Sequence, residues 1–173
     1  MMIARTTTML RTFARLCVLS LAMAGCASLP HDDARTFILV RHAEKAADDP
    51  KDPTLTPAGT ARAQRLADML AHERVVAVYA TAYRRTQLTA APTAASHRLA
   101  VRTYDVSLPA DAFAAQLLRD HAVGTVLVVG HSNTIPALAS ALCRCDIAPM
   151  RDDEFDRVIR LRVGRDGRVV LVE

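Results

Sequence analysis

The chain has 173 residues, of which 51% are hydrophobic and 4% aromatic, with no Trp and a formal net charge of +4. Residues 1–25 hold three of the 22 basic residues and no acidic one, so the rest carries 19 basic and 18 acidic side chains, a net charge of +1. A nearly neutral chain with so few aromatic side chains lacks the basic stripe and stacking platforms of nucleic-acid-binding proteins, and we expect no nucleic-acid partner. The 148 residues after position 25 suffice for one domain with a hydrophobic core.

The first 25 residues have the pattern of a secretory signal. Arg5, Arg11 and Arg15 form a basic start, and residues 16–24 form an apolar segment too short to span a bilayer. Residues 21–26, Leu-Ala-Met-Ala-Gly-Cys, resemble a bacterial lipobox, in which the final Cys is acylated and becomes the first residue of the mature protein. Alternatives are a signal peptide cleaved elsewhere and an uncleaved anchor.

The lipobox resemblance implies a domain anchored in the bacterial cell envelope by lipid on Cys26. Residue 27 is Ala rather than the Asp that retains many lipoproteins in the inner membrane, so we expect the outer membrane, facing the periplasm. The expected organisation is a signal peptide over 1–25, a tether over 26–35 and one folded domain over 36–173.

Strand and helix patterns alternate after the tether. Apolar runs rich in β-branched residues predict strands at 36–41, 75–80, 99–104 and 125–130. Helical spacing of apolar residues predicts helices at 57–71, 83–95, 109–121 and 134–142. Two final strands, 157–163 and 168–172, flank a Gly-Arg-Asp-Gly turn. This order predicts an α/β three-layer sandwich with a mostly parallel sheet and an antiparallel C-terminal hairpin.

The first helix has a clear start signal. Thr56 is the expected N-cap and Pro57 the first helical residue. Its spacing predicts a buried face made of Ala58, Ala61, Leu66, Met69 and Leu70.

Two histidines directly follow predicted strands, His42 after the first and His131 after the fourth. Because the carboxyl ends of parallel strands form the ligand crevice of an open α/β sheet, we expect the two side chains to face one site. A neutral imidazole can attack phosphorus, and the planar fork of Arg41 matches phosphate oxygens. Arg84 and Arg85 follow the second strand, and one of them is expected to point into the same site.

Four elements resemble those of the histidine phosphatase superfamily, the phosphoglycerate-mutase-like group. Residues 41–44, Arg-His-Ala-Glu, resemble its Arg-His-Gly-Glu signature, and residues 55–59, Leu-Thr-Pro-Ala-Gly, resemble its Leu-Thr-x-x-Gly element. Residues 78–90 are similar to its Tyr-Ser-Ser-x-x-x-Arg-x-x-x-Thr-Ala element, and residues 128–134 to its second histidine motif. The elements occur in family order and extend over nearly all of residues 36–163.

The resemblance implies a metal-independent phosphatase without a cofactor, acting on a small phosphorylated substrate or a phosphoprotein. It implies that His42 is the nucleophile and carries the phosphoryl group as phosphohistidine. Arg41 and Arg85 would bind the phosphoryl oxygens, and His131 would stabilise the transition state. Arg84 is interpreted as a solvated helix residue.

The chain departs from the family pattern in three ways. Ala43 replaces a Gly, and Ala80 and Thr81 replace two neighbouring Ser residues, with the expected loss of one hydroxyl contact. The proton donor is not evident, because Ser132 stands where some family members have an Asp. Asp105 and Glu44 are the candidate donors. A donor matters least when the leaving group is already good, as in an acyl phosphate or phosphohistidine.

Other functions remain open on the sequence alone. The chief alternative is a catalytically weak phosphate- or phosphoprotein-binding envelope lipoprotein. A mutase would need an insertion before the helix at 109–121, and a zinc site at His42 and His131 lacks further ligands. Cys143 and Cys145 are expected to be free or loosely paired thiols, with a small strained disulfide or a metal pair as alternatives. His31, His72, His97 and His121 are expected to be surface residues.

Overall fold

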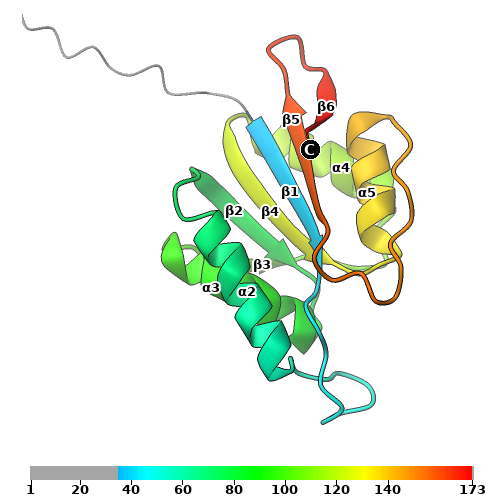
Figure 1. Ribbon diagram of the computed structural model, residues 1–173. Coiled ribbons are helices and arrows are strands. Elements are labelled where there is room, and N and C mark those ends of the chain that lie inside the picture. Colours follow the sequence, from blue (N-terminus) through cyan, green and yellow to red (C-terminus); the bar gives the residue numbers. More distant parts are fainter. Residues whose placement is uncertain (1–34, 173) are drawn as a thin grey trace, which may run out of the picture. The chain divides into compact units, whose positions relative to one another are not determined.

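The computed structural model describes residues 35–172, so the predicted signal segment, Cys26, His31 and nearly all of the tether lie outside the described residues. Six strands form one sheet in the order β3-β2-β4-β1-β5-β6 (Figure 1). They are β1 (Arg35–Arg41), β2 (Val75–Ala80), β3 (Val101–Thr103), β4 (Gly124–Gly130), β5 (Val158–Val163) and β6 (Val169–Val172). The first four run parallel, and β5 pairs antiparallel with both β1 and β6. The predicted mixed sheet with an antiparallel C-terminal hairpin is confirmed.

Four helices cover the two faces of the sheet. They are α2 (Pro57–Met69), α3 (Arg84–Ser96), α4 (Ala110–Asp120) and α5 (Thr134–Cys143). The pair α2 and α3 packs on one face, and α4 and α5 pack on the other (Figure 1). The three-layer α/β sandwich expected from the sequence is therefore correct.

Strand β1 lies at the centre of this arrangement and explains why its sequence is apolar without alternation. Phe37 and Leu39 face the core under α4 and α5, whereas Ile38 and Val40 face the core under α2 and α3. All four are at most 5% exposed. A strand buried on both faces needs apolar side chains at every position, so its end can deliver polar residues to one defined place.

Helix α2 begins as predicted but turns a different face to the core. The Thr56 hydroxyl accepts the Gly59 N–H at 3.0 Å, and Pro57 is the first helical residue. Leu66 and Leu70 are buried, but the expected burial of Ala58, Ala61 and Met69 is wrong. Gly59, Ala63 and Ala67 are buried instead. Small residues are spread over several faces of this helix, so hydrophobic spacing does not fix its orientation.

Two predicted surface histidines are not surface residues. His121 is 8% exposed and its Nε2 lies 3.0 Å from the Tyr79 hydroxyl. His97 is half-buried, with Nε2 3.0 Å from the Leu70 carbonyl oxygen. Both follow the ends of helices that pack on the sheet, and each ring finds a polar partner from a neighbouring element. His72 is exposed, as expected.

The expectation of free or loosely paired thiols at Cys143 and Cys145 is also wrong. The two residues form a disulfide, with their Cα atoms 5.2 Å apart. Between them, Arg144 adopts a left-handed conformation with φ of 54° at the end of α5. This reversal of the chain brings two side chains separated by one residue to the same side.

Candidate active site

The two predicted catalytic histidines meet at the carboxyl edge of the sheet. His42 directly follows β1 and His131 directly follows β4, and these strands are neighbours. The backbone N–H of His42 donates to the Gly130 carbonyl at 2.9 Å, which extends the pairing of the strands by one residue. The imidazole centroids lie 5.5 Å apart, and the residues are 5% and 9% exposed.

The environment of His42 determines which ring nitrogen is free. Nδ1 lies 2.8 Å from the Ala43 carbonyl oxygen, which can only accept, so Nδ1 carries the proton and Nε2 has the lone pair. The pKa of His42 is lowered to about 4, mainly by burial and in smaller part by the charges of His131, Arg85 and Arg41, against the opposing effect of the Ala43 hydrogen bond. The ring is neutral at pH 7.

His131 is held by a hydroxyl group from the residue that follows β2. Its Nε2 lies 3.1 Å from the Thr81 hydroxyl, which in turn lies 2.8 Å from that of Thr86. Thr81 thus keeps a hydroxyl contact in the site, and Ala80 is the position without a hydroxyl. Burial first, and then the charges of Arg85 and Arg41, lower the pKa of His131 to about 4.

Arg41 is anchored by a segment far along the chain. One guanidinium nitrogen donates to the carbonyl oxygens of Arg151 at 3.0 Å and Asp152 at 2.9 Å. The Phe155 ring packs 4.3 Å from the guanidinium carbon, and its centroid lies 6.2 Å from that of His42. The Nε–H of Arg41 is buried and has no hydrogen-bond acceptor within residues 35–172.

Arg84 and Arg85 take different positions at the start of α3. The Arg85 side chain is 15% exposed, its guanidinium carbon lies 4.3 Å from the Tyr83 ring centroid, and the Tyr83 ring is 5.3 Å from His131. Arg84 is exposed, although its backbone N–H donates to the Asp52 carboxylate at 2.9 Å. The same carboxylate lies 3.8 Å from Arg85. The structure thus brings Arg85, not Arg84, to the two histidines.

Both candidate proton donors are occupied elsewhere. Glu44 forms a bidentate pair with Arg62, with a closest distance of 2.7 Å, and this bonding lowers the pKa of the carboxyl. Asp105 is exposed and accepts the backbone N–H and hydroxyl of Ser107, each at 2.8 Å, which lowers its pKa. Both carboxylates stay ionised near pH 7, so neither is arranged as a general acid.

Comparison with known proteins assigns the family. The family model described as "Histidine phosphatase superfamily (branch 1)" matches residues 37–107. The chain is 30% identical to a candidate phosphohistidine phosphatase SixA from Nakamurella multipartitia, over 81% of this chain and 94% of that one, with a TM-score of 0.59. The chain belongs to the histidine phosphatase superfamily.

Two further structures share the fold of this histidine phosphatase. The protein histidine phosphatase SixA complexed with tungstate is 19% identical, with a TM-score of 0.64 over 80% of this chain and 94% of that chain. A mycobacterial glucosyl-3-phosphoglycerate phosphatase is 17% identical, with a TM-score of 0.61 over 80% and 97%. A search of curated proteins found no match.

Three residues of the histidine phosphatase site were missed in the sequence. Asp52 lies just before one family element and Tyr83 lies at a variable position within another, and nothing in their spacing shows that they contact Arg85. Phe155 lies outside every motif, and only the fold brings it to Arg41 and His42. Long-range contacts of this kind leave no periodic signal.

Residues 35–172 contain no group of three or more His, Cys, Asp or Glu side chains that could hold a metal ion. No helix in this part of the chain has the length and apolar character needed to cross a membrane.

Proposed function

We propose that this histidine phosphatase hydrolyses phosphoryl compounds through a phosphohistidine at His42. The Nε2 lone pair attacks phosphorus while the bond to the leaving group breaks. Water then attacks the phosphorus of the intermediate, which releases inorganic phosphate and returns the neutral imidazole. The observation that carries the proposal is the buried His42 ring, neutral and fixed by the Ala43 carbonyl with Nε2 unprotonated.

Around this nucleophile, Arg41, Arg85 and His131 supply the charge stabilisation. The transferred phosphoryl group is loose and anionic, so its reaction depends mainly on positioning and preorganised cations. The buried Nε–H of Arg41 without an acceptor supports this role, because an unsatisfied buried donor is costly until an anion binds to it. These groups belong to the protein itself, and the proposed steps use no metal.

For the substrate we propose a phosphorylated group whose leaving atom needs little help from an acid, above all phosphohistidine on a protein. The support is twofold. Glu44 is paired with Arg62, and Asp105 accepts a hydrogen bond from Ser107 within its own turn, so neither carboxylate is arranged to donate a proton to a leaving group. The relative that is 30% identical is described as a candidate phosphohistidine phosphatase.

The covalent intermediate gives a direct test. The protein is mixed with a ³²P-labelled slow substrate, quenched in alkali and digested. We expect label on His42 that is stable in alkali and lost in acid, and no label in His42→Ala. Label on Ser or Asp would rule out the mechanism.

The substrate class has a separate test. Phosphoramidate and glycerol phosphate are compared by kcat/KM with the same enzyme. Because general acid catalysis contributes about 10²–10⁴-fold where it operates, we expect phosphoramidate to react faster by a factor of that order. Equal rates would show that an acid acts at this site and would overturn the preference for labile phosphoryl groups.

The missing acid also favours a second candidate, a phosphate- or phosphoprotein-binding lipoprotein with weak catalysis. It predicts saturable binding of phosphate or a phosphoprotein that depends on Arg41 and Arg85, with little phosphate release. Turnover that is lost in His42→Ala distinguishes the phosphatase from this binding protein.

We further propose that the domain is tethered through lipid on Cys26 in the outer membrane of a bacterium, facing the periplasm. The lipobox-like sequence at residues 21–26 and the Ala at position 27 support this location. Residues 26–35 would then separate the lipid from the folded domain.

A further inference from the structure

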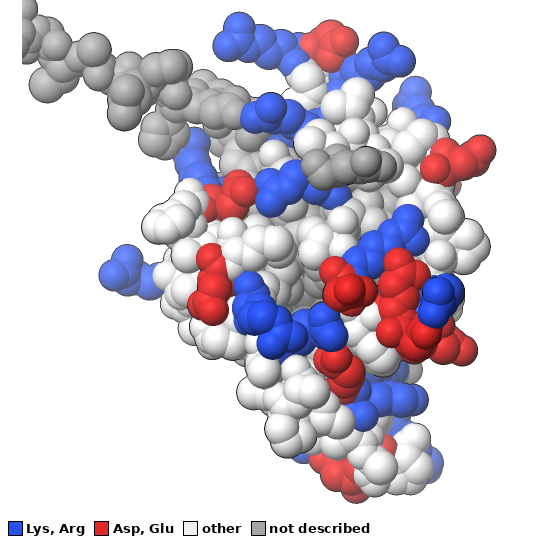
Figure 2. All heavy atoms as spheres, in the orientation of Figure 1, with Lys and Arg blue, Asp and Glu red and all other residues white. Residues whose placement is uncertain are grey.

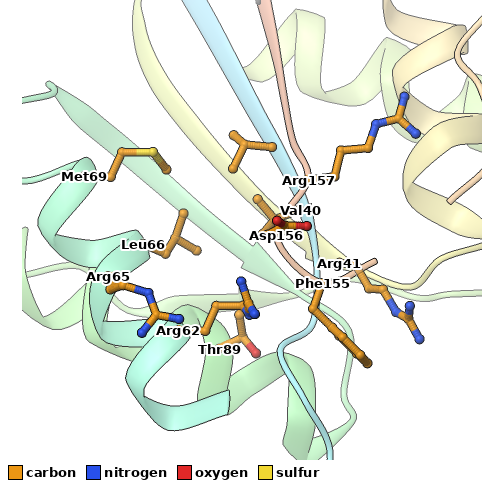
Figure 3. Close-up of a pocket in the computed structure, with 11 residues that line it drawn as sticks. Val40, Arg41, Arg62, Arg65, Leu66, Met69, Thr89, Phe155, Asp156 and Arg157 are labelled. Atoms are coloured by element: carbon orange, nitrogen blue, oxygen red, sulfur yellow. The ribbon is translucent and has the colours of Figure 1, made fainter. Parts of the chain in front are cut away.

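A pocket of about 240 Å³ lies beside the proposed active site, between α2 and the segment that leads into β5. Four residues of α2 line it at positions i, i+3, i+4 and i+7: Arg62, Arg65, Leu66 and Met69. Figure 3 shows them on one side of the pocket, with Phe155 and Asp156 across from them. One face of a helix therefore forms a wall of the pocket.

The inside of this pocket is apolar and its mouth is open. Val40 and Leu66 are 5% and 7% exposed and line its floor, whereas Met69 at 47% and Val158 at 37% are exposed at its edge. These four side chains offer a continuous apolar surface to a molecule from solvent. The volume lies just below the usual range of small-molecule sites, which indicates a small ligand.

The charges around the pocket are unequally divided. In Figure 2, basic side chains gather over α2, and acidic ones gather over the segment between α5 and β5. Arg65 is exposed and has no ion-pair partner in the described part of the chain, whereas Arg62 is paired with Glu44. The single acidic lining residue is Asp156. An anionic group is thus accommodated on the α2 side, next to Arg65.

We propose that this pocket is a second binding site, separate from the phosphoryl site, for a small amphipathic organic anion. The apolar ring or chain of the ligand lies against Val40, Leu66, Met69 and Val158, and its sulfonate, carboxylate or phosphate lies against Arg65. The two sites share a wall, because Arg41 and Phe155 line the pocket and also contact each other beside His42.

Two methionines of the described chain provide a test that does not depend on phosphatase activity. The full chain is labelled with [¹³C-methyl]Met and titrated with naphthalene-2-sulfonate, and the Met69 signal is assigned by its loss in Met69→Leu. We expect a saturable shift of the Met69 methyl group and none at Met150, which is 7% exposed in the core under α4 and α5. The absence of a saturable shift at Met69, or equal shifts at both residues, would overturn the proposal.

Matched variants and a neutral probe test the charge requirement. Arg65→Glu should weaken binding about fivefold or more, because it replaces attraction by repulsion. Arg119→Glu reverses an exposed Arg on α4, across the sheet, and should leave the affinity unchanged. Naphthalene-2-methanol should bind more weakly than the sulfonate. Equal affinity of the two probes, or equal effects of the two variants, would show that no anion is selected here.

Discussion

Two imidazoles and two guanidinium groups lie together at the ends of β1, β2 and β4, and each disfavours further positive charge on its neighbours. Burial and these charges lower the pKa of both His42 and His131 to about 4, from an ordinary value near 6.5. His42, the proposed nucleophile, is therefore mainly neutral between about pH 4 and 6.5, where a free imidazole is mainly protonated.

The pH dependence follows with a definite sign. The unfolded chain binds protons at these histidines below about pH 6.5, whereas the folded chain binds them only near pH 4. The free energy of unfolding should therefore fall as the pH is lowered from 6.5 to 4. We expect imidazole titrations followed by NMR to have midpoints near 4 for both residues, and Arg85→Ala to raise that of His131. Midpoints near 6.5 would contradict this account.

The two adjacent arginines allow a sharp comparison. Arg85→Ala and His131→Ala should each reduce kcat/KM by about 10²–10⁴-fold, since each removes preorganised charge stabilisation. Arg84→Ala should change kcat/KM little, because its side chain is exposed. Steady-state kinetics with phosphoramidate provide the measurement. Equal losses at Arg84 and Arg85 would show that the inward-facing residue is wrongly assigned.

Helix α2 packs closely against the backbone at Glu44, two residues after His42, and Gly59 allows this approach because it has no side chain. A Cβ on Gly59 would overlap the Glu44 carbonyl oxygen, well inside van der Waals contact, and this backbone atom cannot move aside cheaply. Gly59→Ala should lower the free energy of unfolding by about 1–3 kcal/mol, as overpacking does, although Ala normally favours a helix over Gly. Urea denaturation is the measurement.

A neighbouring position on α2 provides the control for this prediction. Ala61 is exposed, and Ala61→Ser should change the free energy of unfolding by no more than about 0.5 kcal/mol. If Gly59→Ala were as stable as the native protein, the contact with Glu44 would not limit the position of the helix.

The elements also show where sequence reasoning succeeded. β1, β2 and β4 are buried on both faces, so their apolar runs marked them within one residue at each end. Because His42 and His131 directly follow such strands, their meeting was predictable as well. The start of α2 was also predicted correctly, because the N-cap Thr56 and the first helical residue Pro57 meet local requirements of a helix start.

The predictions that were wrong or missing concern contacts between distant segments of the chain. The buried face of α2 was wrong because exposed and buried alanines are alike in sequence, and His121 was wrong because its partner Tyr79 lies 42 residues away. The packing of Phe155 on Arg41 likewise has no local cause. Hydrophobic periodicity reports on one element at a time, so it cannot show such pairs.

For the whole molecule, the predicted lipid anchor gives a test in cells. Wild-type protein should incorporate labelled palmitate and stay with the membrane. We expect two acyl chains on Cys26, and two chains anchor a protein stably where one does not. Cys26→Ser should release the protein into the periplasmic fraction or leave an uncleaved precursor, and Cys17→Ser should behave as wild type. Soluble cytoplasmic protein that retains residues 1–25 would contradict the envelope location.

The anchoring of Arg41 links the proposed phosphate binding to the completion of the chain. Its two carbonyl acceptors come from residues 110 and 111 positions later, just before β5. During synthesis, Arg41 and His42 are made early, but the guanidinium group lacks these acceptors until the segment from Arg151 through β5 has been added and β5 has paired with β1. Such distant pairings form late, since their loops must close first. Phosphate affinity should thus appear after most of the helical signal during refolding, and a chain that stops before Arg151 should fail to acquire it.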